Sequence, residues 1–180
     1  MAKKGFIYET QIAAKDVDAL NRFAVAESDV DGGTLVSLGA KTDDVFAATV
    51  ATSGEGGGLW MAYNPSEHFT EIGDNIYAGE NLNVDPREYT NLAGRTFDVF
   101  KPQVGDLVGF TAPNIDSSTI DNIDVNTYLE PMAGGVLKVN ALQSSSFTSF
   151  KVVGIEDVPF PKAGIGYEVA KKYVAECVFN

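Results

Sequence analysis

The side chains best suited to catalysis are scarce: the 180-residue chain contains one histidine, His68, and one cysteine, Cys177. A Ser–His–Asp or Cys–His mechanism would have to use His68, because the chain has no other imidazole. Ser66 lies two residues before it but lacks a Gly-x-Ser-x-Gly turn. Cys177 lies in an apolar, strand-like pattern, where a buried thiol behaves as a small hydrophobic side chain. We therefore expect His68 in a solvated loop, Cys177 in the core, and no enzyme activity.

The scarcity of histidine and cysteine also argues against a metal site. A structural zinc site uses four Cys or His ligands, and this chain has two in total. The segment 29–32 (Asp-Val-Asp-Gly) begins like a calcium loop but lacks the later acidic ligands. Asp116, Asp121 and Asp124 form another acidic stretch without a recognised spacing. Both stretches are more typical of solvated Asx turns, so the sequence predicts no metal and no cofactor.

Carbohydrate chemistry remains an alternative. A glycosidase needs two facing carboxylates, but 25 acidic residues make some such pair inevitable and therefore uninformative. Trp60 and Tyr63 could form a platform for a sugar ring. On a strand, however, positions 60 and 63 face opposite sides, which favours core packing of Trp60. A carbohydrate-binding module would require Trp60 or the tyrosines to be exposed.

Charge and hydropathy restrict the partners. The net charge is −12, from 25 acidic and 13 basic residues, which argues against nucleic acid because phosphate binding depends on clustered Lys and Arg. No apolar run is long enough to span a membrane. The N-terminal MAKKGF is not followed by the apolar stretch of a signal peptide, and the lone cysteine cannot form an internal disulfide. We expect synthesis in a reducing cytoplasm.

The elements expected from the sequence are short strands between Gly- and Asx-rich turns, a pattern typical of sandwiches and small barrels. Residues 64–100 are less regular and are predicted to form a surface excursion. Residues 114–126 are predicted to be a loop and 159–161 (Pro-Phe-Pro) an extended linker. The expected strands are 22–27, 34–38, 45–52, 59–63, 107–111, 127–130, 136–139, 147–153 and 167–179.

One family resemblance follows from the order of these segments. An extended N-terminal arm precedes GGTLVSLG (32–39), LWMAYNP (59–65) and GDLVGFT (105–111), in an acidic chain poor in His and Cys. This arrangement resembles the head decoration (capsid cement) proteins of tailed bacteriophages. The resemblance implies a β-rich, often trimeric protein that clamps neighbouring subunits of the major capsid protein from outside. By position, it implies partner contacts at Lys3, Lys4, Phe6, Ile7 and Tyr8. A strand of this kind can add to a partner's sheet edge, or it can pack on its own domain.

The sequence therefore predicts an all-β fold of small β-sandwich or barrel lobes with short strands, long loops and an extended N-terminal arm. The predicted divisions are an arm at 1–12, a β-rich lobe with an irregular excursion at 13–100, and a small barrel-like lobe at 101–180. We expect a non-enzymatic homo-oligomer on the virion capsid surface, present in the host cytoplasm during assembly. The alternatives are another virion component (tail, baseplate or head fibre) and a carbohydrate-binding β module.

Overall fold

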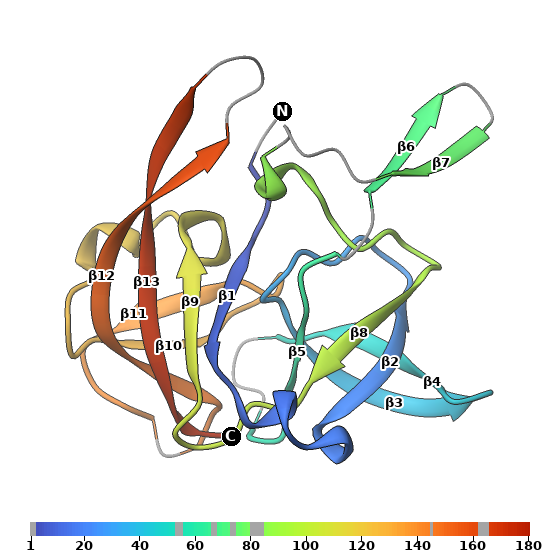
Figure 1. Ribbon diagram of the computed structural model, residues 1–180. Coiled ribbons are helices and arrows are strands. Elements are labelled where there is room, and N and C mark those ends of the chain that lie inside the picture. The colour runs from blue at the N-terminus through green and yellow to red at the C-terminus, as the bar shows by residue number, and fades with distance from the viewer. Residues whose placement is uncertain are drawn as a thin grey trace.

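Strands joined by turns and short 3-10 helices make up the chain (Figure 1), which confirms the all-β fold class. The structure is a computed structural model that describes residues 3–52, 56–65, 68–72, 75–79, 85–144, 146–161 and 166–180. For 68–72 and 75–79 it describes the backbone alone. The strands form a closed barrel, a six-stranded sheet and a two-stranded hairpin.

The closed barrel has five strands, in which β2 runs parallel to β4 and the other pairs described are antiparallel. Its side chains alternate between two environments, as the pleat of a strand requires. Val36, Ala62 and Val99 point into the barrel, whereas their neighbours Leu35 and Met61 point outward into a second core. In spatial order the strands are β2 (Asn21–Ala26), β4 (Val45–Val50), β3 (Leu35–Thr42), β5 (Trp60–Ala62) and β8 (Thr96–Phe100).

The six-stranded sheet combines the beginning and the end of the chain. Every neighbouring pair in it is antiparallel. Its inner face carries Phe110, Phe150 and Cys177 into the same core as the outward-facing barrel residues, so one apolar layer joins the barrel to the sheet. In spatial order its strands are β1 (Ile7–Gln11), β9 (Leu107–Thr111), β13 (Tyr167–Phe179), β12 (Ser149–Pro161), β10 (Tyr128–Pro131) and β11 (Leu137–Asn140).

The remaining described elements are the hairpin β6 (His68–Ile72) and β7 (Asn75–Gly79) and several 3-10 turns. This hairpin and the upper part of β12–β13 both project at the end of the molecule where the N-terminus lies (Figure 1). The part of the chain that the structure describes contains no helix long and apolar enough to cross a membrane. The 3-10 turns are η1 (Ala13–Lys15), η2 (Asp18–Leu20), η3 (Pro86–Glu88), η4 (Ala112–Asn114) and η5 (Ile120–Asn122).

Three expectations from the sequence need correction. His68 begins strand β6 rather than lying in a loop. The stretch 64–100 is not only a surface excursion, because β8 closes the barrel between β5 and β2. The Pro-Phe-Pro segment is not a linker, because β12 continues through Pro161 and pairs with β13 along that length.

The division into three segments stays a prediction, but the strands distribute across it in a definite way. The five barrel strands all come from 13–100. The strands of 101–180 belong to the six-stranded sheet instead of closing a barrel of their own, and β1 from the predicted arm 1–12 completes that sheet.

Asparagine side chains tie the barrel to the sheet across the core. The Asn114 Oδ1 accepts hydrogen bonds from the backbone N–H of Phe6 and of Thr111 (both 3.1 Å), and its Nδ2 donates to the Gly32 carbonyl (2.6 Å). Asn180 donates to the carbonyls of Leu59 and Pro102. Buried polar groups are costly when unpaired, so these networks fix the position of the barrel relative to the six-stranded sheet.

Candidate binding surface on the N-terminal segment and the ribbon

The N-terminal residues predicted to bind a partner are engaged by their own chain. Lys3 Nζ lies 2.9 Å from Asp85 Oδ2 and 3.0 Å from Glu88 Oε1. Lys4 donates its backbone N–H to the Arg87 carbonyl (2.6 Å), and its side chain lies 4.0 Å from Asp31. The basic start of the chain is therefore held by the turn η3.

Strand β1 is equally occupied. Ile7 is 1% exposed and belongs to the core between sheet and barrel. Phe6 and Tyr8 point to the other side of the sheet, where both rings contact Phe160 at centroid distances of 6.0 and 6.1 Å. The structure thus brings Lys3, Lys4, Phe6, Ile7 and Tyr8 together on their own domain, and their role as partner contacts stays a prediction.

A buried ion pair lies at the centre of this region. Asp85 caps η3 by accepting the Arg87 N–H, and the Arg87 guanidinium returns to the same carboxylate at 2.6 Å. Burial alone would raise the pKa of Asp85, but hydrogen bonds from Arg87 and Lys3 outweigh burial and lower the pKa to about 2. The same pairing raises the pKa of Arg87 and of Lys3. The cluster therefore remains charged at neutral pH.

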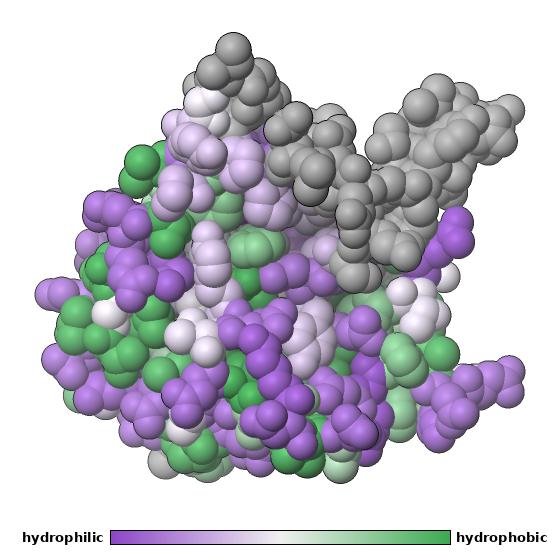
Figure 2. All heavy atoms as spheres, viewed as in Figure 1, coloured by the Kyte–Doolittle hydropathy of each residue, from purple (hydrophilic) through white to green (hydrophobic). Residues whose placement is uncertain are grey.

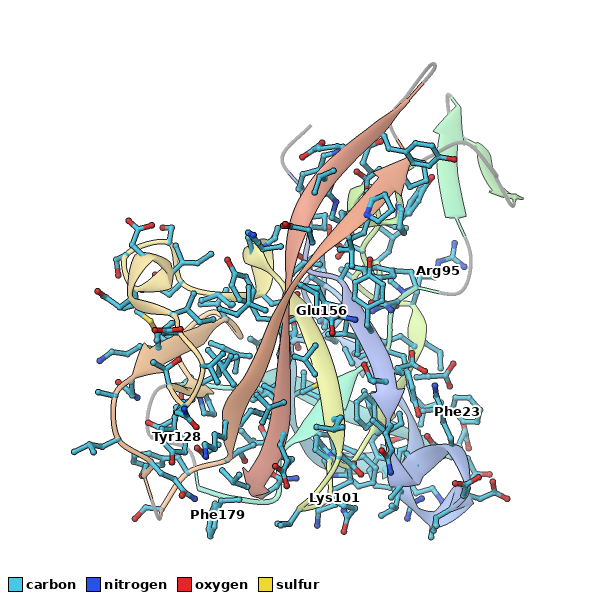
Figure 3. All side chains as sticks on the ribbon, turned by 60° about the vertical axis from the view of Figure 1, so that its left-hand side comes forward. Phe23, Arg95, Lys101, Tyr128, Glu156 and Phe179 are labelled. Carbon is cyan, nitrogen blue, oxygen red and sulfur yellow. The ribbon has the colours of Figure 1, made fainter. Side chains whose placement is uncertain are left out.

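The ribbon, defined here as β12 from Val153 onward with β13 up to Lys172, packs one face on this cluster. The Arg87 guanidinium carbon lies 3.9 Å from the centroid of the Phe160 ring, which is 1% exposed. Arg87 also pairs with Glu168 of β13 at 3.3 Å. Figure 3 shows the two strands crossing beside Glu156, so the ribbon twists strongly as it leaves the sheet.

The opposite face of the ribbon is apolar and exposed. Tyr167 and Val169 are 75% and 65% exposed, and they pair across the strands with Pro161 and Pro159. Residues 167 and 169 lie on the face opposite Glu168, as strand alternation requires. Ile155, farther down the same strand as the prolines, is also exposed. Figure 2 shows hydrophobic residues scattered among hydrophilic ones on the face of the molecule seen in that view.

Acidic side chains of the ribbon are paired with bases. Glu156 lies 2.6 Å from Lys172, and Asp157 lies 2.7 Å from Lys171. The third acid, Glu168, pairs with Arg87. In a chain of net charge −12, the ribbon is a locally neutral surface that carries exposed apolar groups.

The outer edge of β1 is capped by side chains. Ile7 donates its N–H to Asn64 Oδ1 (2.8 Å) and accepts from Asn64 Nδ2 (2.7 Å). Lys15 Nζ donates to the Glu9 carbonyl (2.7 Å). These contacts occupy backbone groups that a further strand would need.

The other edge of the sheet is capped by backbone and side chain together. Asp116 donates its N–H to the Leu137 carbonyl (2.8 Å), and Val139 donates to Thr119 Oγ1 (3.2 Å). Pro159 and Pro161 have no N–H to offer along β12. Side-chain docking on the ribbon face is therefore better supported than strand addition.

The candidate catalytic and metal residues do not assemble into a site where the structure describes them. Burial raises the pKa of the Cys177 thiol to about 12, so it is un-ionised at neutral pH. Ser66 and the His68 side chain lie outside the described residues. Asp29 accepts from the Ala93 N–H and Asp31 from the Gly5 N–H, which are structural roles. No group of three His, Cys, Asp or Glu residues in the described ranges could hold a metal ion.

Trp60 and Tyr63 do not form a common platform. Trp60 packs with the barrel interior, whereas Tyr63 packs with the core between barrel and sheet and donates its hydroxyl to Asn21 Oδ1 (2.9 Å). The expected opposite orientation of the two rings is confirmed.

Sequence reasoning missed the cluster of Asp85, Arg87 and Phe160. The pattern of 64–100 predicts only a surface excursion, although the Asp-Pro pair at 85–86 is a typical start of a helical turn. No local pattern could indicate that Arg87 is buried, because Phe160 lies 73 positions away by residue number. Comparison of the chain with protein-family models, curated proteins and solved structures found no match.

Proposed function

We propose that this chain is a non-enzymatic virion structural protein that binds the outer surface of a bacteriophage capsid and stabilises it by clamping neighbouring capsid subunits. The observation that carries the proposal is the ribbon, whose exposed face presents Tyr167 and Val169 beside paired charges. Interfaces are enriched in aromatic residues and poor in unpaired charge at their centre. The sequence resemblance to decoration proteins supplies the partner class and suggests a homotrimer.

The clamp we propose uses side-chain docking by the ribbon. The buried Arg87–Asp85 pair and Phe160 hold the ribbon from behind, so less conformational freedom is lost when its front face binds. Many weak contacts on a repeating lattice add up, because each bound copy raises the effective concentration for the next contact of a multivalent assembly.

Co-sedimentation with expanded capsids of the phage that encodes the chain tests this proposal. The wild-type protein should pellet saturably with the capsids over a range of salt concentrations, at a copy number proportional to that of the capsid subunits. The double variant Tyr167→Ala/Val169→Thr should bind at least about tenfold more weakly, since central apolar anchors carry most of the binding energy.

Val104→Thr is the matched control, because Val104 is also largely exposed (70%) but lies in the turn before β9. It should bind as the wild type does. Absence of capsid binding at every salt concentration would overturn the proposal. A copy number far below that of the capsid subunits in purified particles would point instead to a tail, baseplate or head-fibre component.

A further inference from the structure

The mouth of the five-stranded barrel contains a hollow of about 580 Å³. It lies where β2 and β4 begin and β3 ends, away from the ribbon, and it shares no residue with the surface described above. The open ends of barrels are frequent ligand sites, since strand ends converge there around an apolar interior. The side chains around this hollow indicate what it could bind.

Arg22 forms one wall of the hollow. Inward positions of β2 alternate, so Ala24 and Ala26 are buried in the barrel and Arg22 occupies the inward position nearest the mouth. Its guanidinium lies 5.4 Å from the centroid of the Trp60 ring, and it donates to the Asn21 carbonyl (2.6 Å). Within the described part of the chain Arg22 has no carboxylate partner, so donors remain available to a ligand.

Two phenyl rings provide the apolar walls. Phe23 is 55% exposed, and Figure 3 shows it at the periphery of the barrel lobe. Phe46, at the start of β4, is half-buried, with Lys41 Nζ 5.9 Å from its ring centroid. Phe23 is therefore a largely exposed apolar side chain at this hollow.

The hollow also contains carboxylate side chains, which can accept hydrogen bonds from a ligand. Asp98 lines the hollow and pairs in register with Phe23 across β2 and β8; the surrounding protein desolvates its carboxyl group and raises its pKa. Lys41 forms an ion pair with Asp44 at 2.5 Å. With Asp18, which also lines it, the hollow presents three acidic and two basic side chains around two phenyl rings.

We propose that the barrel mouth binds a saccharide, with Phe23 against the apolar face of a sugar ring and Arg22 and Asp98 bonding to its hydroxyl groups. A ligand with net charge would face like charges in this hollow, whereas each hydroxyl group both donates and accepts hydrogen bonds. Trp60 does not stack on the sugar in this arrangement but supports Arg22 from below. The proposal is independent of capsid binding.

The test begins with the intact protein on an array of bacterial polysaccharides and oligosaccharides, followed by nuclear magnetic resonance titration with chitotetraose and maltotetraose. We expect retention on at least one glycan and shifts confined to β2, the β3–β4 turn and the Trp60 indole. Phe23→Ala should weaken binding at least tenfold, and Asp98→Asn should weaken it measurably. Leu142→Ala, at a residue 83% exposed on another surface, should leave it unchanged.

Phe23 is exposed, so its replacement leaves the folded barrel available for measurement, which the dispersion of the amide spectrum checks. A silent array together with no shifts at millimolar chitotetraose or maltotetraose would overturn the proposal. Glycan binding that Phe23→Ala and Asp98→Asn both leave unchanged would overturn it as well, because the site would then lie elsewhere.

Discussion

Replacing Asp85 by Asn tests whether the buried ion pair holds the ribbon and the N-terminal segment. The substitution keeps the size of the side chain and one acceptor oxygen but removes the charge facing Arg87 and Lys3. The side chains of Asp85 and Arg87 are 1% and 4% exposed. Removing one partner of a buried pair leaves the other charge uncompensated, which is strongly destabilising.

The magnitude follows from the ionisation of Asp85. Folding lowers its pKa from 3.8 to about 2. A shift of this size stabilises the folded state by about 2 kcal/mol at neutral pH. Because the folded-state pKa is the lower one, the contribution is complete above about pH 4 and is lost as the pH falls toward 2. At pH 3 roughly half of it remains.

Urea denaturation of both proteins at pH 7 and pH 3 measures this contribution. Asp85→Asn should lower the free energy of unfolding by about 2–3 kcal/mol at pH 7 and by about 1 kcal/mol at pH 3. Asp157→Asn is the control, because Asp157 and Lys171 form an exposed pair with side chains 60% and 54% exposed. Its effect should stay below about 0.5 kcal/mol at both pH values.

Two results would refute the reasoning. A loss below about 0.5 kcal/mol at pH 7 would mean that the carboxylate of Asp85 does not hold the cluster together. An equal loss at pH 7 and pH 3 would mean that the substitution acts through packing or hydrogen bonding and not through charge.

Two further predictions concern other buried groups. Asn114→Ala should lower the free energy of unfolding by about 2 kcal/mol in urea, because it leaves the Gly32 carbonyl without its donor and removes an acceptor shared by the N–H groups of Phe6 and Thr111, each of which keeps one other acceptor. Asn122→Ala on an exposed turn should cost under about 0.5 kcal/mol, and similar losses for the two variants would contradict the role of Asn114. Cys177 should react with 5,5′-dithiobis-(2-nitrobenzoic acid) at pH 8 at least about a thousandfold more slowly in the folded protein than in guanidinium, since burial raises its thiol pKa to about 12, and native labelling within tenfold of the unfolded rate would show that the thiol is accessible.

Strand positions could be predicted where alternation and turn residues coincide. The segments 107–111 and 167–179 match β9 and β13. The pattern failed where prolines entered a strand, because Pro159 and Pro161 break the local signal although pairing with β13 keeps β12 extended. Local sequence propensity contains no information about β13, the partner strand that keeps this part of β12 extended.

The candidate surfaces depend on contacts that no local pattern contains. Asn64 reaches Ile7 across 57 positions, and Asn114 reaches Phe6 across 108. A polar residue of this kind looks like an ordinary turn residue in the sequence. Its role arises from the topology, which brings β1 beside β9 and the turn between β2 and β3 beside η4. The position of Arg22 at the barrel mouth cannot be predicted from the local sequence either, because its side chain faces inward only once the barrel has closed.

The strand order also sets the timing of folding during synthesis. The barrel strands all lie between residues 21 and 100, so the barrel can close while the rest of the chain is still being made. The six-stranded sheet cannot form one strand at a time in the order of synthesis, because β13, the most C-terminal described strand, lies between β9 and β12. Until β13 leaves the ribosome, Val108 and Phe110 have a partner strand on one side only. Such long-range pairing slows folding. The six-stranded sheet and the core beneath it therefore remain incomplete until β13 has been synthesised.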